Sequence, residues 1–243
     1  MRSDTSEPRL VPKRTLDPST GEADVNYSWD GRLVPKIQIT GKLVDQLSGY
    51  SLIKKDLDSA LRWIESARKI ASTHPNWGQP GYWHAADREN FDIVKAYFVA
   101  SLAFYGKCFT EAAGRHAQVS RDWLDSNYRA VHDEIMKYRH NLAAHSGDER
   151  IETTKTYVLL QPDRATFLPF LPTARFQPDV ILPSEAELGF EELIKHAGAI
   201  VTEKYNKVAQ KIIAESILPP GVAFWAAAAE KGDSVPLSIP GKR

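Results

Sequence analysis

The sequence predicts a mainly α-helical protein: a four-helix-type bundle, with a small β-hairpin-like insertion between the third and fourth long helices. Three observations support this fold class. Apolar residues recur every three or four positions through most of residues 51–217, a spacing that gives a helix one apolar face. Prolines and glycines separate these stretches. Hydrophobic residues make up 42% and charged residues 26% of the 243 residues, which is enough apolar material for a sizeable core.

Both ends of the chain are expected to be tails. Four prolines and scattered charges break any regular pattern in residues 1–44, which we expect to be partly extended. Residues 45–218 form the predicted helical domain, with the β-insertion at 153–183. Residues 219–243 form a C-terminal tail, which begins with a Pro-Pro-Gly stop.

The first two helices are predicted for residues 51–72 and 87–113. Asp87 is a suitable N-cap for the second, whose wider apolar face marks it as the most buried helix. The stripe of the first helix contains Leu57, Leu61, Ile64 and Ala71. The stripe of the second contains Phe91, Val94, Phe98, Leu102 and Tyr105. The single cysteine, Cys108, lies in an apolar stretch, so we expect it to be buried in the core.

The third helix is predicted for residues 120–145, with Ser120 as its N-cap and Gly147 as its stop. Its apolar face contains Trp123, Leu124, Tyr128, Val131, Ile135, Tyr138 and Leu142. The fourth helix, residues 184–217, opens with the capping-box pattern Ser-Glu-Ala-Glu. These two helices complete the predicted bundle.

A β-insertion is predicted between the third and fourth helices. Residues 153–161 are rich in β-branched and aromatic side chains, Pro162-Asp163 marks a turn, and residues 165–170 follow in the same style. Further prolines between 169 and 183 exclude a long regular sheet.

Charge and cysteine content narrow the functional classes. The 31 basic and 31 acidic residues balance, which argues against a protein coated in positive charge but allows a local basic cleft. One cysteine cannot form an internal disulfide, and we find no signal peptide and no apolar run near the roughly 20 residues that span a bilayer. We therefore expect a cytoplasmic protein without a membrane partner. Phosphate-binding glycine loops and the Gly-x-Ser-x-Gly hydrolase pattern are absent.

The end of the third helix gathers side chains that can handle phosphate and protons. It reads Lys137-Tyr138-Arg139-His140-Asn141-Leu142-Ala143-Ala144-His145. Asn141 and His145 are four residues apart and share a helix face, whereas Arg139 and His145 flank a surface where one ligand can meet both. This segment is the candidate functional centre.

These residue types suit RNA cleavage by the RNA's own 2′-hydroxyl. Arginine offers a forked, permanently charged set of donors that fits phosphate oxygens. Histidine titrates near neutrality and can pass protons in both directions. One group takes the 2′-hydroxyl proton, a cation stabilises the pentacoordinate phosphorus, and an acid protonates the leaving 5′-oxygen. This chemistry requires no metal and no cofactor.

The spacing Arg139-His140, four residues, His145 resembles the signature of the HEPN superfamily (higher eukaryotes and prokaryotes nucleotide-binding domains). Ala144 and Ser146, on either side of the second histidine, also fit that signature. The long helix after the motif is similar to the abortive-infection branch of the superfamily. The resemblance implies a small helical bundle that forms a homodimer, with the two motifs facing each other. It also implies a metal-independent ribonuclease of a toxin–antitoxin or phage-defence system.

The resemblance makes Arg139 and His145 the functional residues, with His140 in support. We add Asn141 from its position on the helix, and we assign Lys137 and Tyr138 with it to substrate binding. RNA is the implied substrate, and an antitoxin or regulatory protein is a further implied partner.

Other interpretations of this segment stay open. Cations near a helix C-terminus stabilise the helix by about 0.3–1 kcal/mol, so Arg139 and the two histidines can serve structure alone. A metal site from His140, His145 and Asp148, with or without His132, is a second alternative, although its spacing matches no tight zinc pattern. The domain can also be a non-catalytic module that binds nucleotide, RNA or a partner protein, or a purely structural bundle.

Overall fold

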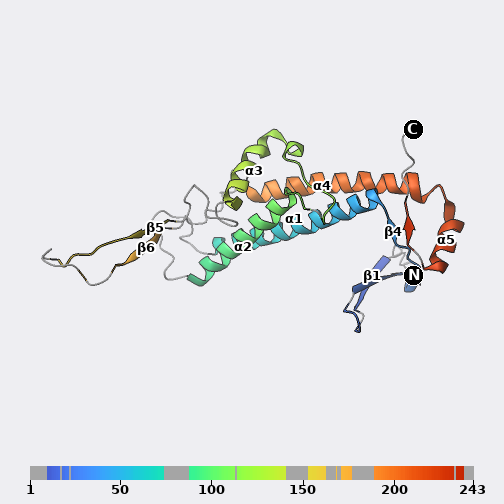
Figure 1. Ribbon diagram of the computed structural model, residues 1–243, viewed down its shortest axis with the longest axis horizontal. Coiled ribbons are helices and arrows are strands. Elements are labelled where there is room, and N and C mark those ends of the chain that lie inside the picture. The colour runs from blue at the N-terminus through green and yellow to red at the C-terminus, as the bar shows by residue number, and fades with distance from the viewer. Residues whose placement is uncertain are drawn as a thin grey trace, which may run out of the picture. The chain divides into compact units, whose positions relative to one another are not determined.

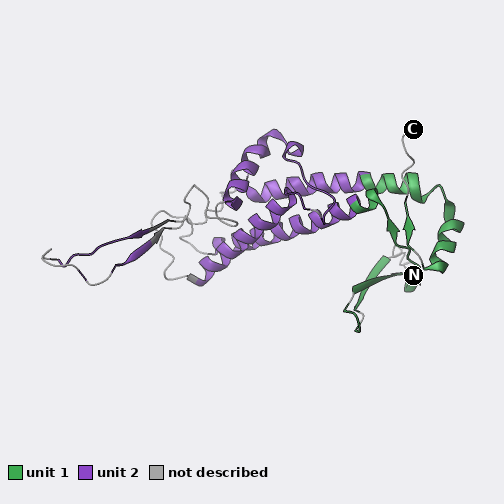
Figure 2. Cartoon of the chain, in the orientation of Figure 1, with its two compact units in different colours: residues 1–45, 208–243 green, residues 46–207 purple. Residues whose placement is uncertain are grey.

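The protein is mainly helical, as predicted (Figure 1). The computed structural model describes residues 10–16, 18–21, 23–73, 88–112, 114–140, 153–162, 168, 171–176, 189–232 and 234–237. The chain forms two compact units, residues 46–207 and residues 1–45 with 208–243 (Figure 2). The long helices are α1 (Lys42–Ser72), α2 (Arg88–Cys108), α3 (Ser126–Tyr138) and α4 (Phe190–Ile212).

Helix α1 begins at Lys42 rather than at residue 51, so the predicted start was too late. This first part of the helix includes the buried Gly49. The glycine is needed because an added Cβ atom there would lie 2.2 Å from the carbonyl oxygen of Arg115, in the connection between α2 and α3. At the next helix, α2 ends at Cys108 instead of residue 113, and the predicted cap Asp87 lies outside the described residues.

The predicted third helix consists of two pieces. A short 3-10 turn, η2 (Arg121–Trp123), is capped as predicted by Ser120, whose hydroxyl accepts a hydrogen bond from the Asp122 amide at 3.3 Å. The chain is extended at Leu124 and Asp125 before α3 begins. Residues 139 and 140 continue the helix as a wider turn, and the predicted stop at Gly147 lies outside the described part of the chain.

The helices of residues 46–207 share one apolar core. Trp63 of α1 meets Phe104 of α2 edge-on, with ring centres 4.7 Å apart. On the other side of α2, Phe98 meets Phe190 of α4 at 6.3 Å. The largest fully buried apolar side chains are Tyr105, Phe190, Ile53, Leu57, Ile64, Leu102, Leu124, Leu193, Ile194, Val94, Val119 and Val201. Cys108 is also fully buried, as predicted.

The predicted insertion contains an antiparallel pair, β5 (Thr153–Thr156) and β6 (Thr173–Phe176). Of the predicted second strand, residues 165–170, only Leu168 is described, and its N–H donates to the Leu159 carbonyl at 2.9 Å; the other residues of that strand lie outside the described part of the chain. The fourth helix is described from Phe190, and its predicted capping box at residues 184–187 lies outside the described residues.

The two expected tails instead form the second compact unit. An antiparallel sheet is built from β1 (Leu10–Leu16), β2 (Ala23–Trp29) and β3 (Arg32–Val34). Strand β4 (Ile39–Thr40) pairs in parallel with β7 (Val235–Pro236). A π-helical turn, η4 (Ile213–Ile217), follows α4 and leads to α5 (Gly221–Lys231). Because β4 and β7 are far apart in sequence, no local pattern predicts their pairing.

The β2–β3 connection did have a local signal that we missed. Asp30-Gly31 joins two strands of alternating residues, and both residues have positive φ, 47° and 77°. Such a pair is the preferred two-residue hairpin turn. No single helix in the described ranges has the length and apolar composition needed to cross a membrane.

Candidate functional site

Arg139 is fixed at the C-terminal end of α3 by contact with α2. Its backbone N–H reaches the carbonyls of Ile135 and Met136, which continues the helix through this residue. Its side chain crosses Gly106, where an added Cβ atom would lie 2.2 Å from Cδ and 2.5 Å from Nε of Arg139. The arginine stem therefore lies against the α2 backbone, and the half-buried side chain holds its guanidinium in one region of the surface.

The other predicted site residues of this segment differ in exposure. Tyr138 is half-buried and meets Phe98 of α2, with ring centres 6.5 Å apart, so it supports the helix end. Lys137 and His140 are exposed. The remaining two predicted site residues, Asn141 and His145, lie outside the described residues. Four of the six predicted residues are thus found together at the end of α3.

A pocket of about 360 Å³ lies beside this helix end. Two of its lining residues, His132 and Met136, precede Arg139 by seven and three positions on α3, which places the three side chains along one helix face. The pocket and the arginine therefore share that face of α3. The lining residues are Phe109, Gln118, Val119, Ser120, Arg121, His132 and Met136.

His132 joins the pocket to the helical core. Its Nδ1 lies 2.8 Å from the hydroxyl of Tyr105, and the two residues are 5% and 0% exposed. In the neutral tautomer that carries its proton on Nε2, the buried Tyr105 hydroxyl can donate to Nδ1. Burial lowers the pKa of His132 and raises the pKa of Tyr105, which favours the neutral form of both groups.

The charges at the pocket rim are compensated. Arg121 donates from Nε and Nη2 to the two carboxylate oxygens of Asp133, at 2.7 and 2.6 Å. This contact lowers the pKa of Asp133 and raises the pKa of Arg121. Phe109, which also lines the pocket, has its ring centre 4.4 Å from the ring centre of His132. The pocket thus offers an aromatic edge and a neutral imidazole, while Arg139 supplies a cation on the same helix face.

A buried ion pair holds the connection that forms one wall of the pocket. Arg115 donates to Asp56 of α1 and, at 2.9 Å, to the carbonyl of Lys107. Lys107 Nζ lies 3.2 Å from Asp56 Oδ2, and Lys55 Nζ lies 3.4 Å from Asp56 Oδ1, which has no hydrogen bond to any described residue. Sequence reasoning missed this pair, because Asp56 and Arg115 are far apart in the chain.

Cys108 is next to this ion pair but is not a reactive thiol. Its Sγ lies 3.2 Å from the carbonyl of Phe104, one turn earlier in α2. Burial raises the pKa of Cys108 to about 12, so the thiol stays protonated near neutrality.

The sequence contains a second, looser Arg-x5-His pattern, from Arg68 to His74. Arg68, the described residue of this pair, has a structural role. Arg68 Nε of α1 lies 3.3 Å from Glu191 of α4, which ties these helices together. His74 lies outside the described residues.

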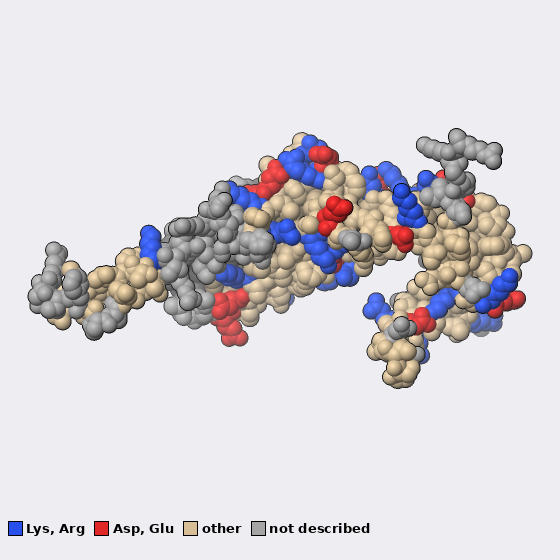
Figure 3. Space-filling view, in the orientation of Figure 1, with Lys and Arg blue, Asp and Glu red and all other residues tan. Residues whose placement is uncertain are grey.

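Basic residues on α4 are offset by neighbouring groups. Lys195 donates to Glu191 at 2.6 Å, Lys207 donates to Glu203, and Lys204 lies 4.5 Å from the ring centre of Trp123. On the face drawn in Figure 3, basic and acidic side chains are interspersed along the helices. The described α4 surface is therefore a solvated helix face.

The alternative metal site of His140, His145 and Asp148 includes residues that the structure does not describe. Among described residues, no three His, Cys, Asp or Glu side chains lie close enough to hold a metal ion, but two of its candidate ligands, His145 and Asp148, are not among them. No protein-family model, curated protein or solved structure matches this chain.

Proposed function

We propose that this chain is a metal-independent endoribonuclease of HEPN type. The observation that supports the proposal is the placement of Arg139: it is held across Gly106 at the end of α3, on the helix face that also lines a neutral pocket. A guanidinium held in this way is suited to a phosphate, and the spacing to His145 is the one that the resemblance requires.

The proposed reaction forms one bond and breaks one. The 2′-oxygen of a ribose attacks the adjacent phosphorus, and the bond from phosphorus to the 5′-oxygen of the next nucleotide breaks. A base takes the proton from the 2′-hydroxyl and an acid gives a proton to the leaving 5′-oxygen; His145 fills one of these two roles, and solvent water fills the other. Arg139 stabilises the extra negative charge on the pentacoordinate phosphorus, and His140 supports it. The products carry a 2′,3′-cyclic phosphate and a 5′-hydroxyl.

The resemblance also supplies the proposed assembly and setting. The chain acts as a homodimer in which two motifs face each other, so each RNA-cleaving site draws on both copies. A toxin–antitoxin or phage-defence role follows, with an antitoxin or regulatory protein as partner. These parts of the proposal rest on the motif alone.

The test is RNA cleavage in EDTA by the wild type, His145→Ala and Arg139→Ala, with analysis of the product ends. Cleavage that survives EDTA, leaves cyclic phosphate ends and falls by at least about 100-fold in both variants supports the proposal. Arg62→Ala is the matched control, because Arg62 is an exposed arginine of α1 whose guanidinium donates to the Ser59 hydroxyl at 3.0 Å. Unchanged cleavage in both motif variants would contradict the assignment.

One observation favours a second candidate function, a non-catalytic module that binds RNA, nucleotide or a partner protein. The chain carries a second compact unit with an exposed aromatic sheet, which a minimal catalytic bundle does not need. RNA affinity without cleavage by the wild type would select this alternative.

A further inference from the structure

The sheet of β1, β2 and β3 has two chemically different faces. Directly paired residues of an antiparallel sheet share a face, and faces alternate along each strand. The register pairs Leu10 with Trp29, Pro12 with Tyr27 and Arg14 with Val25, and it pairs Trp29 with Arg32 across the next strand. These residues therefore form one face, called here the aromatic face. It contains Leu10, Pro12, Arg14, Leu16, Ala23, Val25, Tyr27, Trp29, Arg32 and Val34.

The aromatic rings of this face are open to solvent. Trp29 is 47% exposed and Tyr27 is 37% exposed, although both lie on the central strand of the sheet. Leu10 and Leu16 on β1 are more exposed still. The exposed large apolar residues of the opposite face, Val11 and Leu33, carry no ring, so the exposed rings gather on one face and mark it as a surface that binds another molecule.

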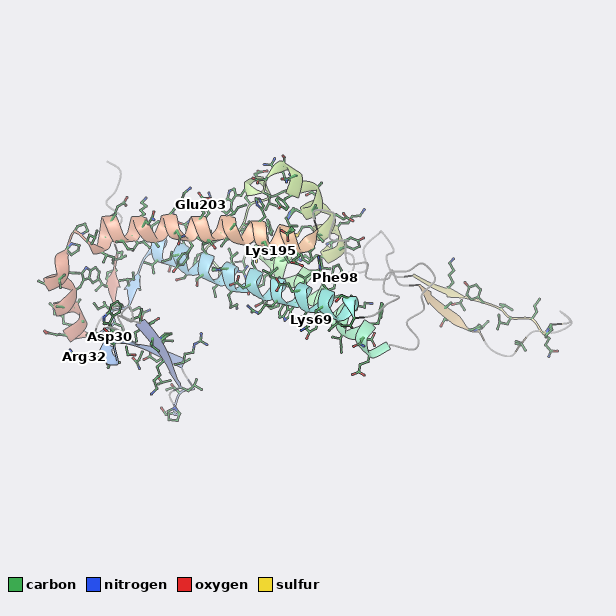
Figure 4. The ribbon with its side chains drawn as sticks, turned by 180° about the vertical axis from the view of Figure 1, so that it is seen from behind. Asp30, Arg32, Lys69, Phe98, Lys195 and Glu203 are labelled. Atoms are coloured by element: carbon green, nitrogen blue, oxygen red, sulfur yellow. The ribbon has the colours of Figure 1, made fainter. Side chains whose placement is uncertain are left out.

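The charge on the aromatic face is positive only. Its charged residues are Arg14 and Arg32, and neither forms an ion pair within the described part of the chain. The acidic residue of β2, Asp24, lies on the opposite face, where it pairs with Lys36. Asp30 lies in the turn that precedes Arg32 (Figure 4).

We propose that the aromatic face binds single-stranded RNA. Exposed rings offer stacking surfaces for successive bases, and this stacking tolerates any base sequence because every base has a π-face. The guanidiniums of Arg14 and Arg32 then contact the phosphates between those bases. A duplex hides the faces of its bases, so this surface selects single strands.

This inference rests on the proposed ribonuclease function and deepens it, because the aromatic face would capture the substrate strand. The residues of the aromatic face lie only in β1 to β3, so they are separate from the proposed catalytic residues. An apolar protein partner is the competing occupant. The positive charge favours RNA, because a purely apolar partner would leave both guanidiniums without a counter-charge.

The test measures the affinity of full-length protein carrying His145→Ala for a fluorescent 12-nucleotide oligouridine, so that RNA remains intact. In that background, Arg14→Glu with Arg32→Glu is expected to weaken binding by more than about tenfold and to reduce the salt slope by about 0.7 per lost contact. Trp29→Ala is expected to weaken binding by about tenfold, and Trp29→Phe, which keeps a ring, by much less.

Matched controls come from the opposite face of the same strands. Lys13→Glu changes the neighbour of Arg14, and Leu33→Ala changes an exposed residue next to Arg32; both should leave the affinity within about twofold of the parent. Equal losses from both faces, or no loss from the aromatic face, overturn the inference. So does a change of oligomeric state in Trp29→Ala with unchanged RNA affinity, which assigns the face to a protein partner.

The cleavage assay separates this inference from the proposed function. If the wild type binds oligouridine through the aromatic face but cleaves no RNA, the binding inference stands and the catalytic proposal fails. If the wild type cleaves RNA and the aromatic-face variants bind as well as their parent, the catalytic proposal stands and the binding inference fails.

Discussion

At Gly106, any side chain competes with Arg139 for the same space. An alanine Cβ would lie 2.2 Å from Arg139 Cδ, so Gly106→Ala must push the arginine to another conformation. Alanine also favours the helix by up to about 1 kcal/mol, so the fold should hold. We expect Gly106→Ala to lower RNA cleavage at least about tenfold with little change in the urea midpoint.

Gly198→Ala is the matched control for this prediction. Gly198 lies in α4, and its added Cβ atom would meet nothing within 4 Å. This variant should unfold at a slightly higher urea concentration and keep full activity. Full activity in Gly106→Ala would show that the position of Arg139 does not matter for cleavage.

The Tyr105–His132 pair predicts a pH dependence of stability. Burial holds the pKa of His132 below its ordinary value of 6.5, so the unfolded chain binds the proton more tightly than the folded chain. The stability that depends on neutral His132 is complete above pH 6.5 and is lost as the pH falls below it. Protonation puts a proton on both ring nitrogens, including Nδ1, which lies 2.8 Å from the Tyr105 hydroxyl.

The measurement is the free energy of unfolding in urea from pH 8 to pH 5. The wild type should lose stability below pH 6.5, and the double variant Tyr105→Phe with His132→Leu should lose less over the same range. Both polar groups are removed together, because removing one leaves its partner unsatisfied at a cost of about 1–3 kcal/mol. His116→Asn, at an exposed histidine, is the control and should keep the wild-type slope.

At the scale of elements, the connection between α2 and α3 depends on one buried ion pair. Asp56→Ala would leave the guanidinium of Arg115 buried without its partner, which costs about 3–5 kcal/mol. Asp56→Leu with Arg115→Met removes both charges and should restore much of the loss. Glu203→Ala, which breaks the exposed pair with Lys207, should change stability little.

Urea unfolding measures these differences, and limited proteolysis locates them. If the ion pair holds the connection, trypsin and chymotrypsin should cut residues 109–125 faster in Asp56→Ala than in the wild type. A stability loss in Asp56→Ala no greater than that in Glu203→Ala would mean that the buried pair is not what fixes this wall of the pocket.

At the scale of the whole molecule, the sequence predicted what depends on local periodicity. The helical class, the apolar stripe of α2 and the burial of Cys108 all follow from spacing along one helix. Contacts between distant segments were not predictable in this way. The packing of Arg139 on Gly106 and the hydrogen bond between Tyr105 and His132 depend on how α2 and α3 meet. The pairing of β4 with β7 depends on the two ends of the chain coming together.

The N-terminal sheet is the instructive failure. Its prolines indicated a tail, but Pro12 lies on an edge strand, where a missing N–H costs nothing if it faces solvent. The Asp30-Gly31 turn and the alternation of Val25, Tyr27 and Trp29 were present in the sequence. The prolines and scattered charges outweighed this alternation in our prediction, so we expected residues 1–44 to form a partly extended tail.

The distribution of buried side chains predicts different local stabilities in the two units. All buried hydrophobic side chains among the described residues, except Ile212, lie in residues 46–207. The sheet of β1 to β3 keeps its hydrogen bonds without a buried core, so those bonds should open at a low free-energy cost. Hydrogen exchange followed by mass spectrometry should show residues 10–34 exchanging within minutes, long before the middle of α1 and α2.

Single-stranded RNA should change this pattern in one place. If the aromatic face binds RNA, the ligand stabilises the folded sheet by mass action, and exchange at residues 10–34 should slow as oligouridine is added to the His145→Ala protein. The cores of α1 and α2 should keep their rates, because their opening already requires loss of the buried helical packing. Equal protection of sheet and helices without RNA would contradict the stability argument, whereas unchanged sheet exchange at saturating RNA would place the binding surface elsewhere.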